Sequence, residues 1–149
     1  MQRHQYILML SLSTARKLKE AGLLWRPASH DFFAIPDRDF EDNVFVISDI
    51  FVNVELVRGR LAATFQGSVE WALDHVVIEE LVWLPTEEQL RQELERRLIA
   101  VSGAGLKLSS TPGGYVCEFV VGEQAWRFEA LDASEAYAAA LLHLLAASP

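Results

Sequence analysis

The fold of this chain is decided by the stretch Val82-Trp83-Leu84-Pro85-Thr86-Glu87-Glu88-Gln89-Leu90. Its apolar run ends at Pro85, which has no backbone N–H to continue a strand ladder. Thr86 and Gln89 then form a capping box, in which the hydroxyl and the amide each satisfy a free backbone N–H. Leucines follow at steps of four residues, at Leu90, Leu94 and Leu98. This spacing predicts an amphipathic helix.

Three strands and a second helix are expected after this first helix. Alternating segments and glycine-containing turns place the strands at residues 106–108, 115–121 and 124–130. Counting by twos puts nine side chains on one face, which two helices would cover: Leu106, Leu108, Tyr115, Cys117, Phe119, Val121, Trp126, Phe128 and Ala130. We expect Asp132 and Glu135 to open the last helix as a variant capping box.

Two valines of the middle strand, Val116 and Val120, fall on the opposite face of this predicted sheet. An outer face that carries apolar side chains is normally covered by other protein. We therefore interpret Val116 and Val120 as a candidate interface.

The helix–strand–strand–strand–helix order of residues 86–147 is similar to the double-stranded RNA-binding fold. Members of that family use lysines at the start of the last helix to bind phosphates. The corresponding stretch here is Asp132-Ala133-Ser134-Glu135-Ala136, and the helix that it opens contains neither Lys nor Arg. The resemblance therefore implies the topology without the basic residues that bind RNA.

The N-terminal half is expected to contain one short helix and several antiparallel strands. Cap candidates at residues 11–14 and Gly22 delimit the helix. The expected strands run over residues 31–36, 44–48, 51–57 and 60–66, with a tight hairpin turn at Arg58-Gly59. The strand at 44–48 is so apolar that we expect both of its faces to be buried. For residues 67–81 we favour a short helical or irregular piece before a strand that runs through Trp83.

These elements predict an α+β fold with two lobes. The N-terminal helix and an antiparallel β lobe occupy residues 1–82, and the αβββα lobe occupies residues 83–149; we expect them to pack as one unit. Of the 149 residues 51% are hydrophobic, and the mean hydropathy is +0.15. Such a chain can offset the entropy of ordering, and its apolar excess favours self-association.

The charge of the chain limits its partners. The formal net charge is −8, and residues 76–149 carry 5 basic and 11 acidic residues, net −6. Nucleic acid and anionic membranes are therefore disfavoured, because both require a positive surface. A lone cysteine, Cys117, and the absence of a run of about 20 apolar residues indicate a cytoplasmic protein.

No cofactor or metal motif was found in the sequence. None of the eight glycines precedes a lysine, which excludes a phosphate loop, and the four histidines are dispersed. One alternative remains open, a small hydrolase or ligand-binding protein in which carboxylates and tryptophans form a cleft in the N-terminal lobe. Its candidate ligand or partner contacts are Trp25, Asp31, Asp49, Glu70, Trp71 and Asp74.

Four segments resemble a family of short bacterial proteins without an established activity, some of which carry a pilus-assembly label. They are Leu18-Lys19-Glu20-Ala21-Gly22-Leu23-x-Trp25-x-Pro27, Val44-Phe45-Val46-Ile47-Ser48-Asp49, Glu70-Trp71-Ala72-Leu73-Asp74 and Trp83-Leu84-Pro85. The resemblance covers about residues 11–147 and leaves residues 1–10 as an extension. The order of elements is also loosely similar to that of small phage-encoded proteins. The resemblance supplies no catalytic residue.

Together these observations favour a non-enzymatic cytoplasmic interaction or accessory protein of mobile-element origin. We expect its partner to be a second copy of itself, in a homo-oligomer, or another protein. Neither nucleic acid, membrane, metal nor cofactor is expected.

Overall fold

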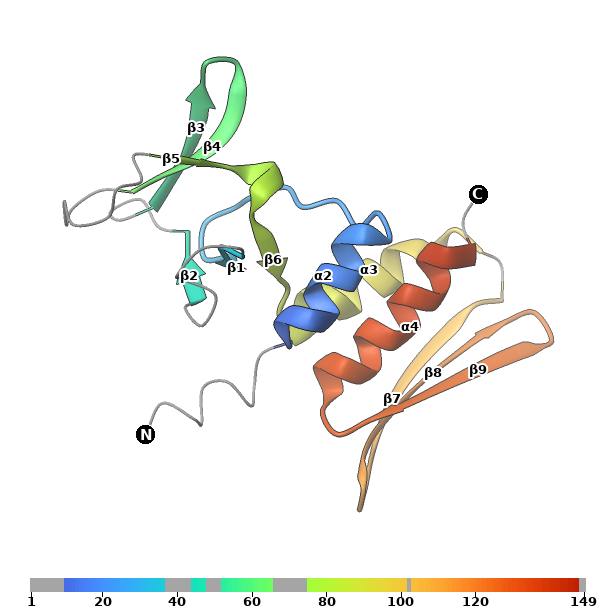
Figure 1. The fold of residues 1–149 in the computed structure, drawn as a ribbon. Coiled ribbons are helices and arrows are strands. Elements are labelled where there is room, and N and C mark those ends of the chain that lie inside the picture. Colours follow the sequence, from blue (N-terminus) through green and yellow to red (C-terminus); the bar gives the residue numbers. More distant parts are fainter. Residues whose placement is uncertain (1–9, 37–43, 48–51, 66–74, 102, 148–149) are drawn as a thin grey trace. The chain divides into compact units, whose positions relative to one another are not determined.

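The computed structural model describes residues 10–36, 44–47, 52–65, 75–101 and 103–147, and it shows the predicted α+β fold (Figure 1). Two compact units are present. The first combines Met1–Leu23 with Pro85–Pro149, and the second is Leu24–Leu84. Within the described residues, no helix is both long enough and apolar enough to cross a membrane.

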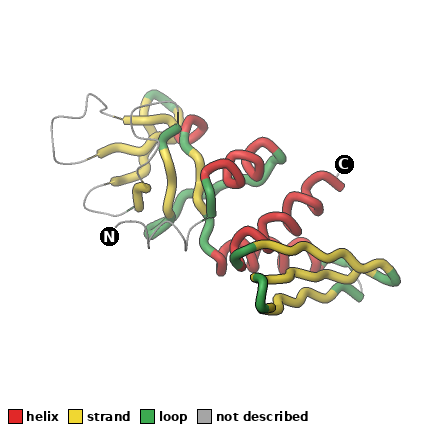
Figure 2. Tube along the Cα trace, turned by 60° about the horizontal axis from the view of Figure 1, so that its bottom comes forward, coloured by secondary structure: helices red, strands yellow, loops and turns green. Residues whose placement is uncertain are grey.

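The first unit contains an antiparallel sheet of order β7-β8-β9 with helices on one face (Figure 2). Its elements are α2 (Leu12–Glu20), α3 (Glu87–Ile99), β7 (Gly105–Thr111), β8 (Gly114–Val121), β9 (Gln124–Ala130) and α4 (Ala133–Ala147). The αβββα order predicted for residues 86–147 is therefore confirmed.

The register of this sheet places the nine predicted core residues on one face. Cys117 lies opposite Leu108 and Phe128, and Phe119 lies opposite Leu106 and Trp126. The imidazole of His143 on α4 lies over this face, with its ring centre 5.4–5.9 Å from the rings of Phe119, Trp126 and Phe128. Helix α4 therefore covers the face predicted to be apolar.

The start of α3 is the predicted capping box. The Thr86 hydroxyl accepts the Gln89 backbone N–H at 3.2 Å, and the Gln89 side chain accepts the Thr86 N–H at 2.9 Å. The three leucines spaced by four residues are all buried, at Leu90, Leu94 and Leu98.

The start of α4 differs from a complete capping box. Asp132 Oδ1 accepts the backbone N–H of Glu135 at 2.8 Å, which is the expected half of the box. The Glu135 carboxylate instead accepts the Ser11 N–H at 3.0 Å and the Thr14 hydroxyl at 2.7 Å. A negative charge is favourable there, because the N-terminal end of α2 carries partial positive charge.

Helix α2 consequently belongs to the unit that contains α3 and α4. This differs from the expectation that the helix belongs to the N-terminal lobe. A contact between Glu135 and Thr14 spans 121 residues, and no local pattern indicates it. The boundary between Leu84 and Pro85 lies two residues beyond the expected one.

The second unit contains two small antiparallel sheets, ordered β2-β1-β6 and β3-β4-β5. Its elements are β1 (Phe32–Ala34), β2 (Val44–Val46), β3 (Val52–Val57), β4 (Arg60–Phe65), β5 (His75–Val77), the 3₁₀ helix η1 (Ile78–Glu80) and β6 (Val82–Leu84). A buried cluster forms its core: Phe33, Ile35, Ile47, Ala63 and Leu81. Of the segment 67–81, residues 75–80 form β5 and then η1, so a short strand precedes the helical turn, the reverse of the expected order; residues 67–74 lie outside the described part.

The expectation that the strand near residue 44 is buried on both faces is wrong. Val44 and Val46 are 37% and 39% exposed, and only Phe45 between them packs against the core. Alternate side chains of a strand point to opposite faces, and the core of the second unit covers only the face that carries Phe45.

Candidate interaction surface

Two of the residues predicted to contact a ligand bind each other instead. The indole N–H of Trp25 donates to Asp31 Oδ2 at 2.9 Å, and the backbone N–H of Ala28 donates to the same oxygen at 3.0 Å. Asp31 is 5% exposed. This carboxylate therefore closes the turn before β1 and anchors the tryptophan. The other four candidates, Asp49, Glu70, Trp71 and Asp74, lie outside the described residues.

Trp25 is part of an aromatic stack in the second unit. Its ring lies parallel to that of Trp83, with centres 6.4 Å apart and planes 6° apart, and it also packs on Phe33 at 5.9 Å. Stacked rings in this distance range stabilise a core beyond the area that they bury. The geometry supports a packing role for Trp25.

Titratable side chains do not gather as ligands in the described part of the chain. No group of three or more His, Cys, Asp or Glu residues within it is placed to hold a metal ion. Cys117 is fully buried, and burial raises the pKa of its thiol to about 11. Because the thiolate is the nucleophilic form, this thiol is poorly suited to covalent chemistry.

The outer face of the β7-β8-β9 sheet carries charged side chains that form ion pairs with one another. The guanidinium of Arg127 pairs with Glu118 at 2.9 Å and with Glu129 at 3.1 Å. Val116, one of the two candidate interface residues, is only 4% exposed, whereas Val120 is 40% exposed. Val116 therefore offers almost no surface to a partner.

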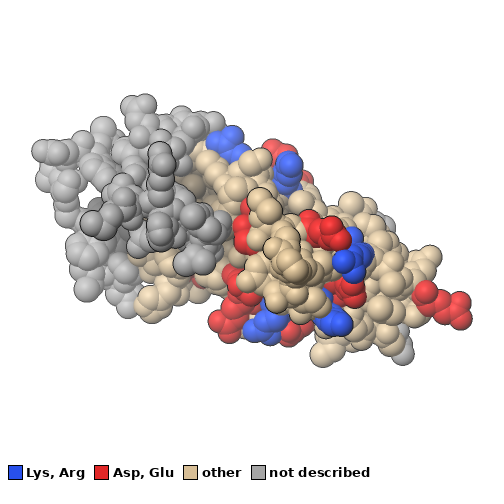
Figure 3. Space-filling model, turned by 90° about the horizontal axis from the view of Figure 1, so that it is seen from below, with Lys and Arg blue, Asp and Glu red and all other residues tan. Residues whose placement is uncertain are grey.

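A hollow of about 390 Å³ lies at one end of this outer face. Val116, Arg127 and the exposed Leu131 are among its lining residues. The arginine in its wall already binds two carboxylates, so it has limited capacity to recognise an anion. On the face shown in Figure 3, acidic and basic side chains alternate among the described residues. A groove of single positive sign, which nucleic acid requires, is not part of that face.

The clearest apolar surface of the second unit lies at the end of the β3–β4 hairpin. Arg58 and Gly59 have φ angles of 53° and 82°, as the two central residues of a type I′ turn require. Beyond the turn, Leu56 and Leu61 are directly opposite each other, and their side chains are 71% and 49% exposed. We call these two residues the leucine pair.

The leucine pair continues the buried face of the hairpin beyond the core. One step further from the turn on the same face, Val54 lies opposite Ala63. Ala63 belongs to the buried core cluster and Val54 packs against it. Side chains two apart on a strand point to the same side, so the leucine pair faces the same way but has no core beneath it.

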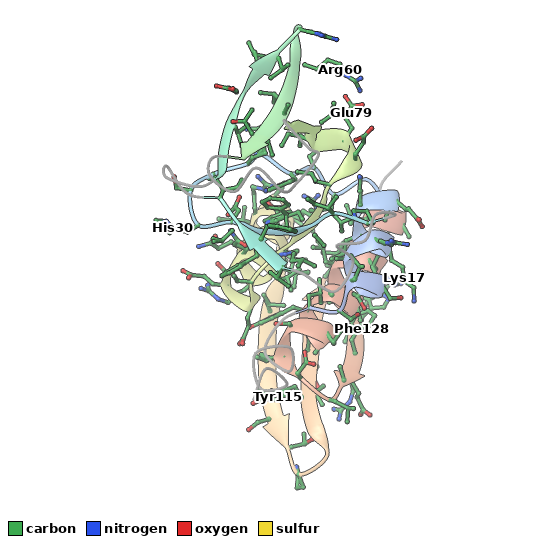
Figure 4. All side chains as sticks on the ribbon, turned by 60° about the vertical axis from the view of Figure 1, so that its left-hand side comes forward. Lys17, His30, Arg60, Glu79, Tyr115 and Phe128 are labelled. Atoms are coloured by element: carbon green, nitrogen blue, oxygen red, sulfur yellow. The ribbon has the colours of Figure 1, made fainter. Side chains whose placement is uncertain are left out.

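An ion pair lies beside the hairpin turn. Arg60 Nη2 is 2.9 Å from Glu79 Oε2, and Figure 4 shows the two side chains near one another. Both are more than half exposed, so we expect less than about 1 kcal/mol of stability from the pair. Near the turn, Glu55 and Arg60 place charged side chains on the face opposite the leucine pair.

The hairpin was predictable from the sequence, whereas the exposure of the leucine pair was not expected. A detectable signal was present, because Leu56 and Leu61 are equidistant from Arg58-Gly59 and a two-residue turn must place such residues opposite each other. Their exposure depends on where the core ends, which the sequence does not specify.

Comparison with known proteins adds no relative to this description. No protein-family model, no curated protein and no solved structure matches the chain.

Proposed function

We propose that this is a non-enzymatic cytoplasmic interaction protein that binds a protein partner through the β3–β4 hairpin. The leucine pair carries the proposal. Two leucines at a hairpin end, 71% and 49% exposed and in one row, contribute little to folding in their present position. They become favourable when another apolar surface covers them.

The magnitude is sufficient for a specific contact. Burying a leucine side chain contributes about 1.5–3 kcal/mol. With the exposed fractions of the leucine pair, complete burial would contribute roughly 2–4 kcal/mol. A few well-buried side chains carry most of the energy of a typical protein interface, and two leucines are enough to act as such anchors.

The use of Asp31 also supports the proposal over the hydrolase alternative. A general acid or base must reach a substrate, whereas Asp31 is buried and accepts two hydrogen bonds from its own unit. Nucleic-acid binding has less support still, because the net charge is −8 and opposite charges alternate on the face shown in Figure 3.

Capture of partners from extracts of the native host would test the hairpin. We would compare the wild-type protein with the double variant Leu56→Ser/Leu61→Ser and with the control Leu131→Ser, whose leucine is 86% exposed in the other unit. We expect the hairpin variant alone to lose its partners while its circular dichroism spectrum is unchanged. Retention of the same partners by both variants would contradict the proposal.

A further inference from the structure

We propose that the partner of the hairpin is a second copy of this chain, paired edge to edge through β3 about a twofold axis at Leu56. This inference rests on the proposed function, because it names the occupant of the same surface. Strand β3 has a neighbour, β4, on one side only among the described residues.

Among the long edge strands of the described residues, β3 alone carries a large apolar residue that is exposed, Leu56 at 71%. Edges are usually blocked by charged side chains or by being short. In the first unit, β7 contains Lys107, and β9 contains Arg127 and Glu129. In the second unit, β2, β5 and β6 have three residues each. Strand β3 has six residues and one charge, Glu55, which is as few charges as in β7.

The backbone of Leu56 has the orientation that a twofold pairing needs. In a tight two-residue turn, the closing pair exchanges hydrogen bonds, and the next pair does not. The closing pair here is Val57 and Arg60, and the next is the leucine pair. The N–H and C=O of Leu56 therefore point away from β4, toward the open edge, where an identical residue can accept and donate in turn.

Twofold symmetry restricts the registers that two β3 strands can adopt. An axis perpendicular to the sheet makes the strands antiparallel and keeps each face continuous. Even-numbered residues then lie opposite even-numbered residues, and odd-numbered opposite odd-numbered. Centring the axis on Leu56 gives an unbroken row of four leucines across four strands: Leu61 and Leu56 of one copy, then Leu56 and Leu61 of the other. The side chains of the two Leu56 residues then become cross-strand neighbours and cover each other's flanks.

The neighbouring registers are less favourable. Centring on Glu55 would place two carboxylates directly opposite each other, which is destabilising. Centring on Val54 would use a side chain that already packs against its own core. With the axis at Leu56, Glu55 lies opposite Val57 of the second copy, and like charges are separated.

The interface of the proposed dimer is small, so we expect the two copies to associate weakly. Stable interfaces bury about 800 Å² on each partner, and here the overlap is about five residues of one strand with a leucine pair on each side. The two copies also repel through a net charge of −8 each. We expect association that becomes measurable only at high protein concentration and that strengthens as added salt screens the charge.

Disulfide trapping tests the register directly. The native Cys117 is fully buried, so an introduced cysteine is the accessible thiol. In the proposed dimer the two Leu56 Cα atoms are about 5.5 Å apart, within disulfide range, whereas the two Leu61 positions are about 14 Å apart. We expect Leu56→Cys to form a covalent dimer at least about tenfold faster than the matched control Leu61→Cys. Equal rates would overturn the register and the twofold pairing.

Sedimentation equilibrium tests association without a new thiol. From about 10 to about 300 µM, we expect the average mass of the wild-type protein to rise and that of Leu56→Asp to stay monomeric, with both proteins folded. If the wild type stays monomeric and the capture of host partners still depends on the leucine pair, the proposed dimer is overturned and the proposed function is not. If the wild type stays monomeric and the capture of host partners does not depend on the leucine pair, the dimer and the proposed function are both overturned. Association that persists in Leu56→Asp would overturn this inference alone.

Discussion

Removal of the Glu135 carboxylate should weaken the attachment of α2 to α4. That carboxylate accepts the Ser11 N–H at 3.0 Å and the Thr14 hydroxyl at 2.7 Å. Hydrogen bonds to a charged group contribute about 1.5–3 kcal/mol each when they are shielded from water. Glu135 is half-buried and the Ser11 bond is exposed, so we discount the sum and expect Glu135→Ala to lower the free energy of unfolding by about 2 kcal/mol.

A double-mutant cycle isolates the bond to Thr14 from other effects. Thr14→Val keeps the shape of the side chain but removes its hydroxyl, and we expect it to cost about 1 kcal/mol. In the double variant with Glu135→Ala, the coupling energy should be about 1 kcal/mol, because each single change already breaks the shared bond. Glu123→Ala, at an exposed turn residue, is the matched control and should change stability by less than about 0.5 kcal/mol.

Urea unfolding followed by far-ultraviolet circular dichroism is the appropriate assay. All α-helices in the described residues lie in the first unit, so the helical signal reports on the unit that contains Glu135. A separate transition of the second unit would otherwise confuse the comparison. The reasoning would be refuted if Glu135→Ala matched the wild type, or if the Thr14 and Glu135 effects were additive.

Three further predictions concern the first unit. Because burial raises the pKa of Cys117 from 9.0 to about 11, the unfolded chain loses this proton first, and stability should fall by about 2–3 kcal/mol between pH 9 and pH 11. Urea unfolding across this pH range should show a smaller loss of stability in Cys117→Ala. Some loss remains, because Tyr137, whose pKa burial also raises, titrates in both proteins. Gly114→Ala should destabilise by about 3 kcal/mol or more in thermal unfolding, because a Cβ there would clash with the Ala130 carbonyl oxygen at a φ of 143°. Gly113→Ala, with open space around its Cβ, is the control and should cost less than about 1 kcal/mol. Leu94→Ala should cost about 3 kcal/mol in urea unfolding, whereas Ile99→Ala, 85% exposed on the same helix, should be nearly neutral.

The C-terminal elements were predictable because their signals are local. The Thr86 box, the leucine spacing and the alternation in β8 each depend on residues within a few positions of one another. The burial of β2 was not predictable in the same way. Whether an apolar strand is central or at an edge is decided by which strands pair with it, and β2 pairs with β1 alone among the described residues.

The candidate site was predictable only in part. Sequence reasoning selected Trp25 and Asp31, and the structure brings them within 2.9 Å. It did not anticipate that the indole and the carboxylate would satisfy each other, because six residues separate them across an irregular turn. The leucine pair was missed for a different reason: both residues read as ordinary strand positions, and only the end of the core leaves them exposed.

The sheet of the first unit and the β3–β4 hairpin differ in how their apolar surface is covered, and the difference favours the hairpin as the place where partners bind. In the first unit, α4 covers the inner face of the sheet, and Arg127 links Glu118 and Glu129 across the outer face. In the second unit, the hairpin runs past its core and leaves Leu56 and Leu61 71% and 49% exposed. Exposed leucines lower solubility without stabilising the isolated unit. A contact that covers them gives those two side chains a physical role.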